Sequence, residues 1–128
     1  MGNPHIVFFV DDATQVPLPD IGPRVETHPH FPHKTNVEFV SPLAALGGVT
    51  HLRMRVWERG VGITLACGSA ACATAVAAMH RGLCDDAVNV QMAGGTLRLR
   101  RDDKGHIWMT GPTAHVCSGT LAPELLCD

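Results

Sequence analysis

One helix-forming segment near the middle of the chain constrains the fold more than any other feature. It runs from Cys67 to Met79 as Cys-Gly-Ser-Ala-Ala-Cys-Ala-Thr-Ala-Val-Ala-Ala-Met, and its residues are small or apolar almost throughout. A helix without a polar face belongs inside a protein, because it has no side to offer to water. We therefore expect the rest of the chain to wrap around it. The helix should end at Gly82, with His80 and Arg81 in its last turn, where cations complement the helix dipole.

The start of this helix predicts a reactive sulfur. Cys67 is followed directly by Gly68 and Ser69, so it lies where the helix should begin. The first N–H groups of a helix have no intrahelical partners, and they favour a thiolate and attract anions such as a carboxylate. Cys72 lies inside the helix, and it is expected to be an inert buried thiol.

Composition and charge narrow the function classes. The chain has 128 residues, of which 45% are hydrophobic, and this suits one domain with a substantial core. Its formal net charge of -2 gives no reason to expect nucleic acid or an anionic membrane as a partner. No apolar run approaches the ~20 residues needed to span a bilayer. The first residues lack the basic region of a signal peptide, so we expect none.

Five cysteines and eight histidines raise the question of disulfides and metal binding. The number of cysteines is odd, and Cys67 and Cys72 should point to different faces of one helix. Reduced thiols in a cytoplasmic protein fit this pattern best. His28, His30 and His33 lie in a proline-broken loop, which does not fix ligand geometry, so we predict no metal.

The remaining pattern is mostly short strands. Alternating or buried apolar segments predict strands at residues 5–10, 37–40, 51–57, 88–92, 96–100, 106–110 and 114–117. A short helix is expected at 21–26, a connection at 41–50, and turns at 93–95 and 102–105. The tail from residue 118 shows no clear pattern. We predict an α+β fold, in which a mixed, largely antiparallel sheet wraps around one central apolar helix.

Four motifs, taken in order, resemble those of one enzyme family. They are Met-Gly-Asn-Pro-His at 1–5, Phe-Pro-x-x-Thr-Asn-Val-Glu-Phe at 31–39, Glu-Arg-Gly-x-Gly-x-Thr-x-Ala-Cys-Gly-Ser at 58–69, and Met-Thr-Gly-Pro at 109–112. On these residues the chain resembles the C-terminal half of diaminopimelate epimerase, an isomerase of bacterial lysine and cell-wall precursor synthesis. The likeness runs over nearly all of the chain.

The resemblance implies a two-domain enzyme that uses no cofactor and holds diaminopimelate between its domains. Each domain of the family supplies one cysteine: one thiolate takes the α-proton, and the other thiol donates a proton to the opposite face. Residues 1–128 would be a single domain matching the C-terminal one, and the tail at 116–128 would lie against the first domain. The partners implied are therefore the amino-acid substrate and the missing N-terminal domain. Without that domain we expect the chain to form a homodimer.

The resemblance also implies roles for particular residues. Cys67 would be one of the two acid–base cysteines, and His5 and Glu58 would tune the cysteines and position the amino acid. The substrate would be held by Asn3, Asn36, Glu58, Arg59, Gly68 and Ser69. Elementary chemistry supports part of this, because backbone N–H groups at a helix start can stabilise the negative charge that develops on a substrate carboxylate.

The sequence departs from the family pattern in three places. No counterpart of the first domain is present, and none of the other four cysteines has a glycine-rich helix start before it. Ile63 stands where many family members carry Glu, and Ala70-Ala71 where many carry Gly-Ala. We expect both changes to be tolerated. The chain is therefore expected to be half an enzyme that is inactive alone.

Two alternatives to this function remain open, and a third is discounted. A proline racemase or hydroxyproline epimerase would share the architecture and the paired-cysteine chemistry, although the Glu58-Arg59 pair suits the distal polar end of diaminopimelate better. A folded, non-catalytic binding or assembly fragment is the second alternative. A pyridoxal phosphate racemase needs a Schiff-base lysine, and it is discounted because Lys34 and Lys104 both lie in loop-like segments.

Overall fold

A computed structural model describes residues 2–126 of the chain. Seven strands form one sheet in the order β1-β2-β3-β5-β6-β7, and β4 pairs with β3 beside this path. The strands are β1 His5–Phe9, β2 Asn36–Leu46, β3 Val49–Glu58, β4 Gly62–Ile63, β5 Ala87–Met92, β6 Gly95–Arg101 and β7 Ile107–Thr110. The β1–β2 and β3–β5 pairs are parallel and the others antiparallel. The predicted mixed, largely antiparallel sheet is confirmed.

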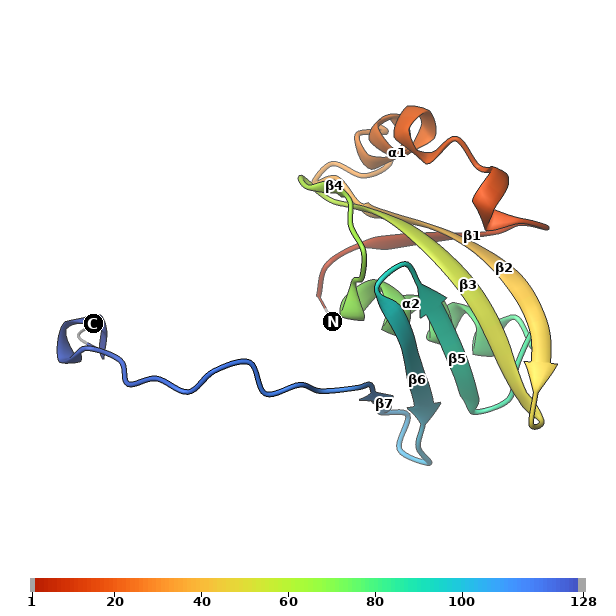
Figure 1. The fold of residues 1–128 in the computed structure, drawn as a ribbon. Helices are drawn as coiled ribbons and strands as arrows, with labels where there is room; N and C mark the ends of the chain where they lie inside the picture. The colour runs from red at the N-terminus through yellow and green to blue at the C-terminus, as the bar shows by residue number, and fades with distance from the viewer. Residues whose placement is uncertain (1, 127–128) are drawn as a thin grey trace.

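Helix α2, Gly68–His80, is the central helix that the apolar segment predicted. The sheet curves around it, and α2 contacts six of the strands (Figure 1). Its small side chains allow this close approach; four that are fully buried are Ala70, Ala71, Ala75 and Ala78. The helix ends as expected, because Gly82 adopts a φ of 69° and the N–H of Leu83 donates to the carbonyl of Ala78 at 2.9 Å.

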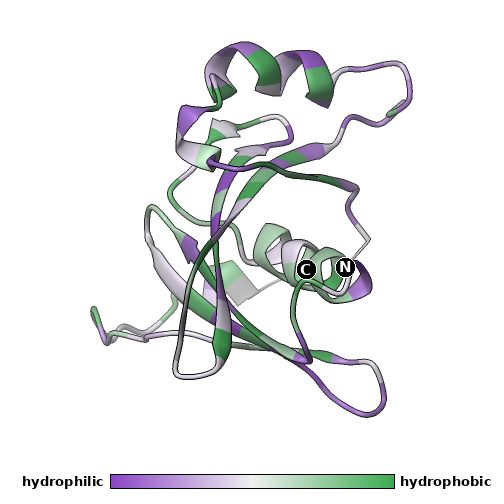
Figure 2. Ribbon diagram, turned by 90° about the vertical axis from the view of Figure 1, so that its right-hand side faces the viewer, coloured by the Kyte–Doolittle hydropathy of each residue, from purple (hydrophilic) through white to green (hydrophobic). Residues whose placement is uncertain are grey.

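A second helix covers the other face of the sheet. Helix α1, Leu18–Glu26, follows a 3-10 turn, Ala13–Gln15, and lies on the side opposite α2 (Figures 1 and 2). Alternation along β2 explains this arrangement, since Val37 and Phe39 pack in the α1 cluster and Val40 in the α2 cluster. The helix starts three residues earlier than predicted, because proline is favoured in the first turn of a helix.

The secondary structure predicted for two segments is wrong. Residues 41–50 are not a connection: β2 continues to Leu46, and a tight turn at Gly47 and Gly48, with φ of 60° and 75°, leads into β3. Residues 114–117 form no strand, because this stretch is exposed chain leading away from the sheet (Figure 1), and Val116 is 89% exposed. The tail ends in a 3-10 turn, η2, Pro123–Leu126. Cys127 lies outside the described residues.

The two ends of the sheet leave one side of α2 uncovered. In the described chain, β1 and β7 are the edge strands, each with one neighbour. Val76 on α2 is 45% exposed, and His80 is exposed as well. No helix in residues 2–126 has the length and apolar character that crossing a membrane requires.

Candidate active site

Polar side chains gather on the inner face of the sheet where α2 begins. Parallel pairing sets His5 of β1 opposite Asn36 of β2. Because side chains alternate along a strand, Asn36 lies on the same face as Val40, which packs against α2. The side chain of Asn3, just before β1, donates from Nδ2 to Ser69 Oγ in the first turn of α2 at 3.2 Å. The fold thus brings together Asn3 and Ser69, two predicted substrate-binding residues that are far apart in the sequence.

Cys67 is the N-cap residue of α2, with extended backbone angles of φ −144° and ψ 109°. Its side chain is half-buried, and Sγ lies 3.4 Å from Ser69 Oγ. The N–H groups of Gly68 and Ser69 begin the helix and have no intrahelical partners, so they can receive an anion. Met109 of β7 lies over this point, since a Cβ on Gly68 would be 3.4 Å from its sulfur. Cys67 therefore lies at the helix start, as expected, and the binding of a substrate carboxylate there stays a prediction.

Glu58 is held in place by Thr64, a residue for which the sequence predicted no role. Thr64 Oγ1 donates to Glu58 Oε1 at 2.5 Å, across the β3–β4 turn. The loop that follows is fixed in turn, because the N–H of Gly94 donates to the carbonyl of Leu65 at 2.7 Å. Thr64 lies within the twelve-residue motif, so its place beside the glutamate was a signal that could have been used.

Asn36 and Arg59 are tied into the backbone. Asn36 Nδ2 donates to the carbonyl of Pro4 at 3.1 Å, and Oδ1 accepts from the N–H of Arg59 at 2.8 Å. Arg59 is exposed, and its Nη1 donates to the carbonyl of His33 at 3.2 Å. Asn36 therefore joins three segments of the site, and its predicted substrate contact stays a prediction.

Glu26 supports the site from the opposite side of the sheet, and no sequence pattern indicates this role. This α1 carboxylate is 5% exposed and accepts from Trp57 Nε1 at 2.6 Å and from the N–H of Gly60 at 2.9 Å. The Trp57 hydrogen bond is the main reason that the pKa of Glu26 lies below its ordinary value. A glutamate in the last turn of a helix usually faces water, so only the tertiary structure identifies it as an anchor of the glycine loop.

His5 pairs with a buried glutamate that sequence analysis did not single out. Its Nδ1 lies 2.7 Å from Glu38 Oε1, and Glu38 is fully buried. Burial raises the pKa of Glu38 to about 8 and lowers the pKa of His5 below its ordinary value. The signal was present, because strand alternation places Glu38 with Val40 on the inner face, where a carboxylate is rare unless it is paired.

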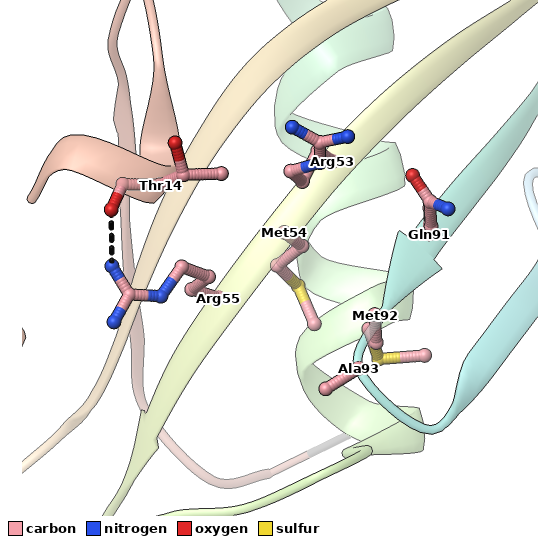
Figure 3. Close-up of a pocket in the computed structure, with 7 residues that line it drawn as sticks. All are labelled: Thr14, Arg53, Met54, Arg55, Gln91, Met92 and Ala93. Atoms are coloured by element: carbon pink, nitrogen blue, oxygen red, sulfur yellow. Dashed lines mark hydrogen bonds between the residues drawn. The ribbon is translucent and has the colours of Figure 1, made fainter.

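A separate cavity of about 380 Å³ lies beside the 3-10 turn, away from Cys67 (Figure 3). It is lined by Thr14, Arg53, Met54, Arg55, Gln91, Met92 and Ala93. Nη1 of Arg55 is engaged by the carbonyls of Ala13, Thr14 and Val16 at 2.7 to 3.3 Å, which makes Arg55 a structural residue. The lining has no thiol, imidazole or carboxylate, so we place the candidate chemistry at the start of α2.

The histidine loop does not form a cluster of ligands. His28 and His30 contact each other edge to face, with ring centroids 4.9 Å apart. Across residues 2–126, no group of three or more histidine, cysteine, aspartate or glutamate side chains converges to hold a metal ion.

The thiols should differ in reactivity. Burial raises the pKa of the Cys72 and Cys84 thiols above the ordinary value, whereas Cys67 is half-buried at a helix start. We expect iodoacetamide near neutral pH to label Cys67 before Cys72 and Cys84, measured site by site by mass spectrometry. Labelling in denaturant, where the three rates should converge, is the control. Faster labelling of Cys72 or Cys84 in the folded chain would show that the assignment of the reactive sulfur is wrong.

Comparison with solved structures shows the fold to be one already known. The chain resembles the crystal structure of the Bacillus anthracis phenazine biosynthesis protein of the PhzF family, with a TM-score of 0.55 and 21% identity. The likeness covers 85% of this chain and 34% of that one. At this identity it supports the α+β architecture with a mixed sheet around a helix, and nothing about activity.

Sequence comparison shows the family. The model described as "Diaminopimelate epimerase" matches residues 1–116, and this chain belongs to the diaminopimelate epimerase family. It is 54% identical over 121 residues to the diaminopimelate epimerase of Erythrobacter litoralis, with 94% of this chain and 44% of that protein covered. It is 51% identical over 126 residues to that of Rhodospirillum centenum, with 98% and 42% covered. The chain thus spans less than half the length of these curated relatives.

Proposed function

We propose that this chain supplies one half of the active site of a cofactor-independent epimerase that interconverts LL- and meso-diaminopimelate in lysine biosynthesis, in the cytoplasm. The observation that carries the proposal is the arrangement at the start of α2. There a thiol, two N–H groups without intrahelical partners and the Asn3–Ser69 hydrogen bond meet within one turn of helix. The family membership and the relatives' names support this choice of substrate.

The chemistry follows from what an α-proton requires. That proton is weakly acidic, so removing it needs a base together with stabilisation of the charge that develops on the carboxylate. The N–H groups of Gly68 and Ser69 would bind the carboxylate, and Cys67 would act on the α-carbon from one face. When a thiolate removes the proton, a thiol on the opposite face protonates the carbanion; the configuration inverts and the two sulfurs exchange their protonation states.

The second acid–base group should come from outside the described residues. Cys72 is buried in the core, Cys84 packs against that core, and Cys117 lies in the exposed segment after β7. None of these three is at a helix start. We propose that a first domain, in the same protein or in a separate chain, supplies the second cysteine. The tail from residue 116 would then lie against that domain, and a second copy of this chain would not be needed.

Glu58 and Arg59 would recognise the end of the substrate far from the reacting carbon. The two side chains belong to the turn that Asn36 and Thr64 hold in place. One carboxylate and one guanidinium suit the second amino acid group of diaminopimelate, which carries both charges. Proline has no such group, so it should not be a good substrate.

Turnover should require the first domain. We define the fused enzyme as this chain joined to the part of the Erythrobacter litoralis relative that it does not cover. The isolated chain should give no useful turnover of LL-diaminopimelate, because one of the two acid–base groups is missing and each contributes ~10²–10⁴-fold. The fused enzyme should convert it to the meso form, measured by a coupled assay, and it should leave proline unchanged. Robust turnover by the isolated chain would contradict the half-site proposal.

A further inference from the structure

Glu38, the buried partner of His5, is a residue to which the proposed mechanism gives no task. The side chain of Glu38 is fully buried, and that of His5 is 7% exposed. A hydrogen bond of 2.7 Å links His5 Nδ1 to Glu38 Oε1. The other atoms, His5 Nε2 and Glu38 Oε2, are buried and have no hydrogen-bond partner within the described residues. A buried polar atom without a partner is costly, so this pair calls for a reason.

The geometry gives the imidazole a direction. Along the inner face of β2, Asn36 comes first and is bonded to Pro4, Glu38 comes next, and Val40 is part of the core. Glu38 therefore binds the His5 ring from its core side. The two nitrogens of an imidazole point in nearly opposite directions. With Nδ1 held by Glu38, Nε2 points away from Glu38, and it is the buried atom of the ring that has no hydrogen-bond partner within the described residues.

We propose that Glu38 is a positioning residue: by binding Nδ1 it fixes the ring of His5 and presents Nε2, with its proton, to the substrate site at the start of α2. The inference rests on the proposed function, which places the substrate there. Glu38 does not touch substrate itself. It sets which nitrogen of His5 carries the hydrogen, as the partner of one ring nitrogen generally does for the other.

The pKa values of the two groups determine which nitrogen of His5 carries the hydrogen. Burial disfavours the charged form of both groups, and it raises the pKa of Glu38 to about 8 while lowering the pKa of His5. Near neutral pH the pair is therefore a carboxylic acid and a neutral imidazole. The acid O–H donates to Nδ1, and the one hydrogen of the ring is on Nε2. When the pair loses a proton above about pH 8, the carboxylate accepts from Nδ1–H and Nε2 becomes bare.

The charges that face the pair come from two other segments. Glu58, at the end of β3, raises the pKa of both groups, whereas Arg59 and the amino-terminal charge lower that of His5. All of these act on the pair through space, because the one group bonded to His5 Nδ1 is the Glu38 carboxyl.

The test is the protonation of His5, read by NMR on the chain with 15N-labelled histidine. Near neutral pH we expect hydrogen on Nε2 and a bare Nδ1, with a change to hydrogen on Nδ1 as the pH passes about 8. In Glu38→Gln the side-chain amide can still donate to Nδ1, so the Nε2–H form should persist and its change at high pH should disappear. Exposed His28 and His80 are internal controls that the substitution should leave unchanged.

A second variant separates positioning from simple packing. Glu38→Leu fills the space without a partner for Nδ1, so His5 should show a mixture of both tautomers. Hydrogen on Nδ1 near neutral pH in the parent chain would overturn the proposal, as would a high-pH change that survives in Glu38→Gln. If Glu38→Leu does not fold, the Glu38→Gln comparison still decides. This readout needs no turnover, so it stands or falls separately from the epimerase proposal.

Discussion

Replacing Cys67 with serine should abolish epimerisation by the fused enzyme and leave its fold intact. The side chain is half-buried at the N-cap of α2, where serine is a favoured residue, so the substitution removes the sulfur without disturbing the helix start. A hydroxyl is a far weaker base than a thiolate, and loss of one acid–base group lowers the rate by about 10²–10⁴-fold. The measurement is the initial rate of conversion of LL-diaminopimelate, with circular dichroism to verify the fold.

The matched control for this variant is Cys72→Ala. Cys72 lies on the same helix, but it is 8% exposed and packs in the core. Its loss should lower stability modestly and leave the rate at saturating substrate close to that of the parent. A parental rate in Cys67→Ser would remove Cys67 from the chemistry, whatever the control shows.

Gly22→Ala should destabilise the chain by about 1–3 kcal/mol, the usual cost of overfilling a packed site. A Cβ at this position in α1 would lie 2.6 to 2.8 Å from three ring atoms of Trp57. The indole cannot move away freely, because its Nε1 donates to the buried Glu26 carboxylate at 2.6 Å. Alanine gains about 1 kcal/mol over glycine in a helix interior, and we expect the clash to outweigh that gain.

Urea unfolding of the chain measures the effect of Gly22→Ala. The control is Gly119→Ala, which makes the same chemical change in the exposed tail, where nothing lies within 4 Å of the added carbon. That variant should be neutral. An unfolding midpoint for Gly22→Ala equal to or above that of the parent would contradict this prediction. It would mean that the Trp57 ring moves to accommodate the added carbon at little energetic cost.

The central helix could be predicted from sequence because its evidence is local. Thirteen consecutive residues, 67–79, are small or apolar, Gly68 lies near their start and Gly82 follows shortly after their end, so one stretch of chain carries the pattern, the start and the stop. The β2–β3 hairpin was missed because Pro42 interrupts it, and proline argues against a strand interior. The structure resolves the conflict: β1 pairs with β2 only as far as Val40, so Pro42 lies where one side of β2 has no neighbour.

Part of the candidate site could also be predicted because its evidence is local in the sequence. The motif at 58–69 places Glu58, Cys67, Gly68 and Ser69 close together in sequence, and the structure keeps the last three at one helix start, with Glu58 close enough to His5 to act on its pKa. The supporting contacts join segments far apart in the chain. His5 and Glu38 are 33 positions apart, and Trp57 and Glu26 are 31 apart. Periodicity can place such residues on a face, but only the fold shows which of them meet.

The most direct test of the two-base account is the fate of the α-hydrogen when the fused enzyme converts LL-diaminopimelate in D₂O. Cys67 on one face and a second cysteine on the other predict that the inverted carbon of the product carries solvent deuterium from the first turnovers. Substrate recovered early should have exchanged little, because the base that removes its proton is not the acid that labels the product. Mass spectrometry of both isomers gives the answer. Meso product that retains its original α-hydrogen would mean that a single base acts on both faces, and it would contradict the account.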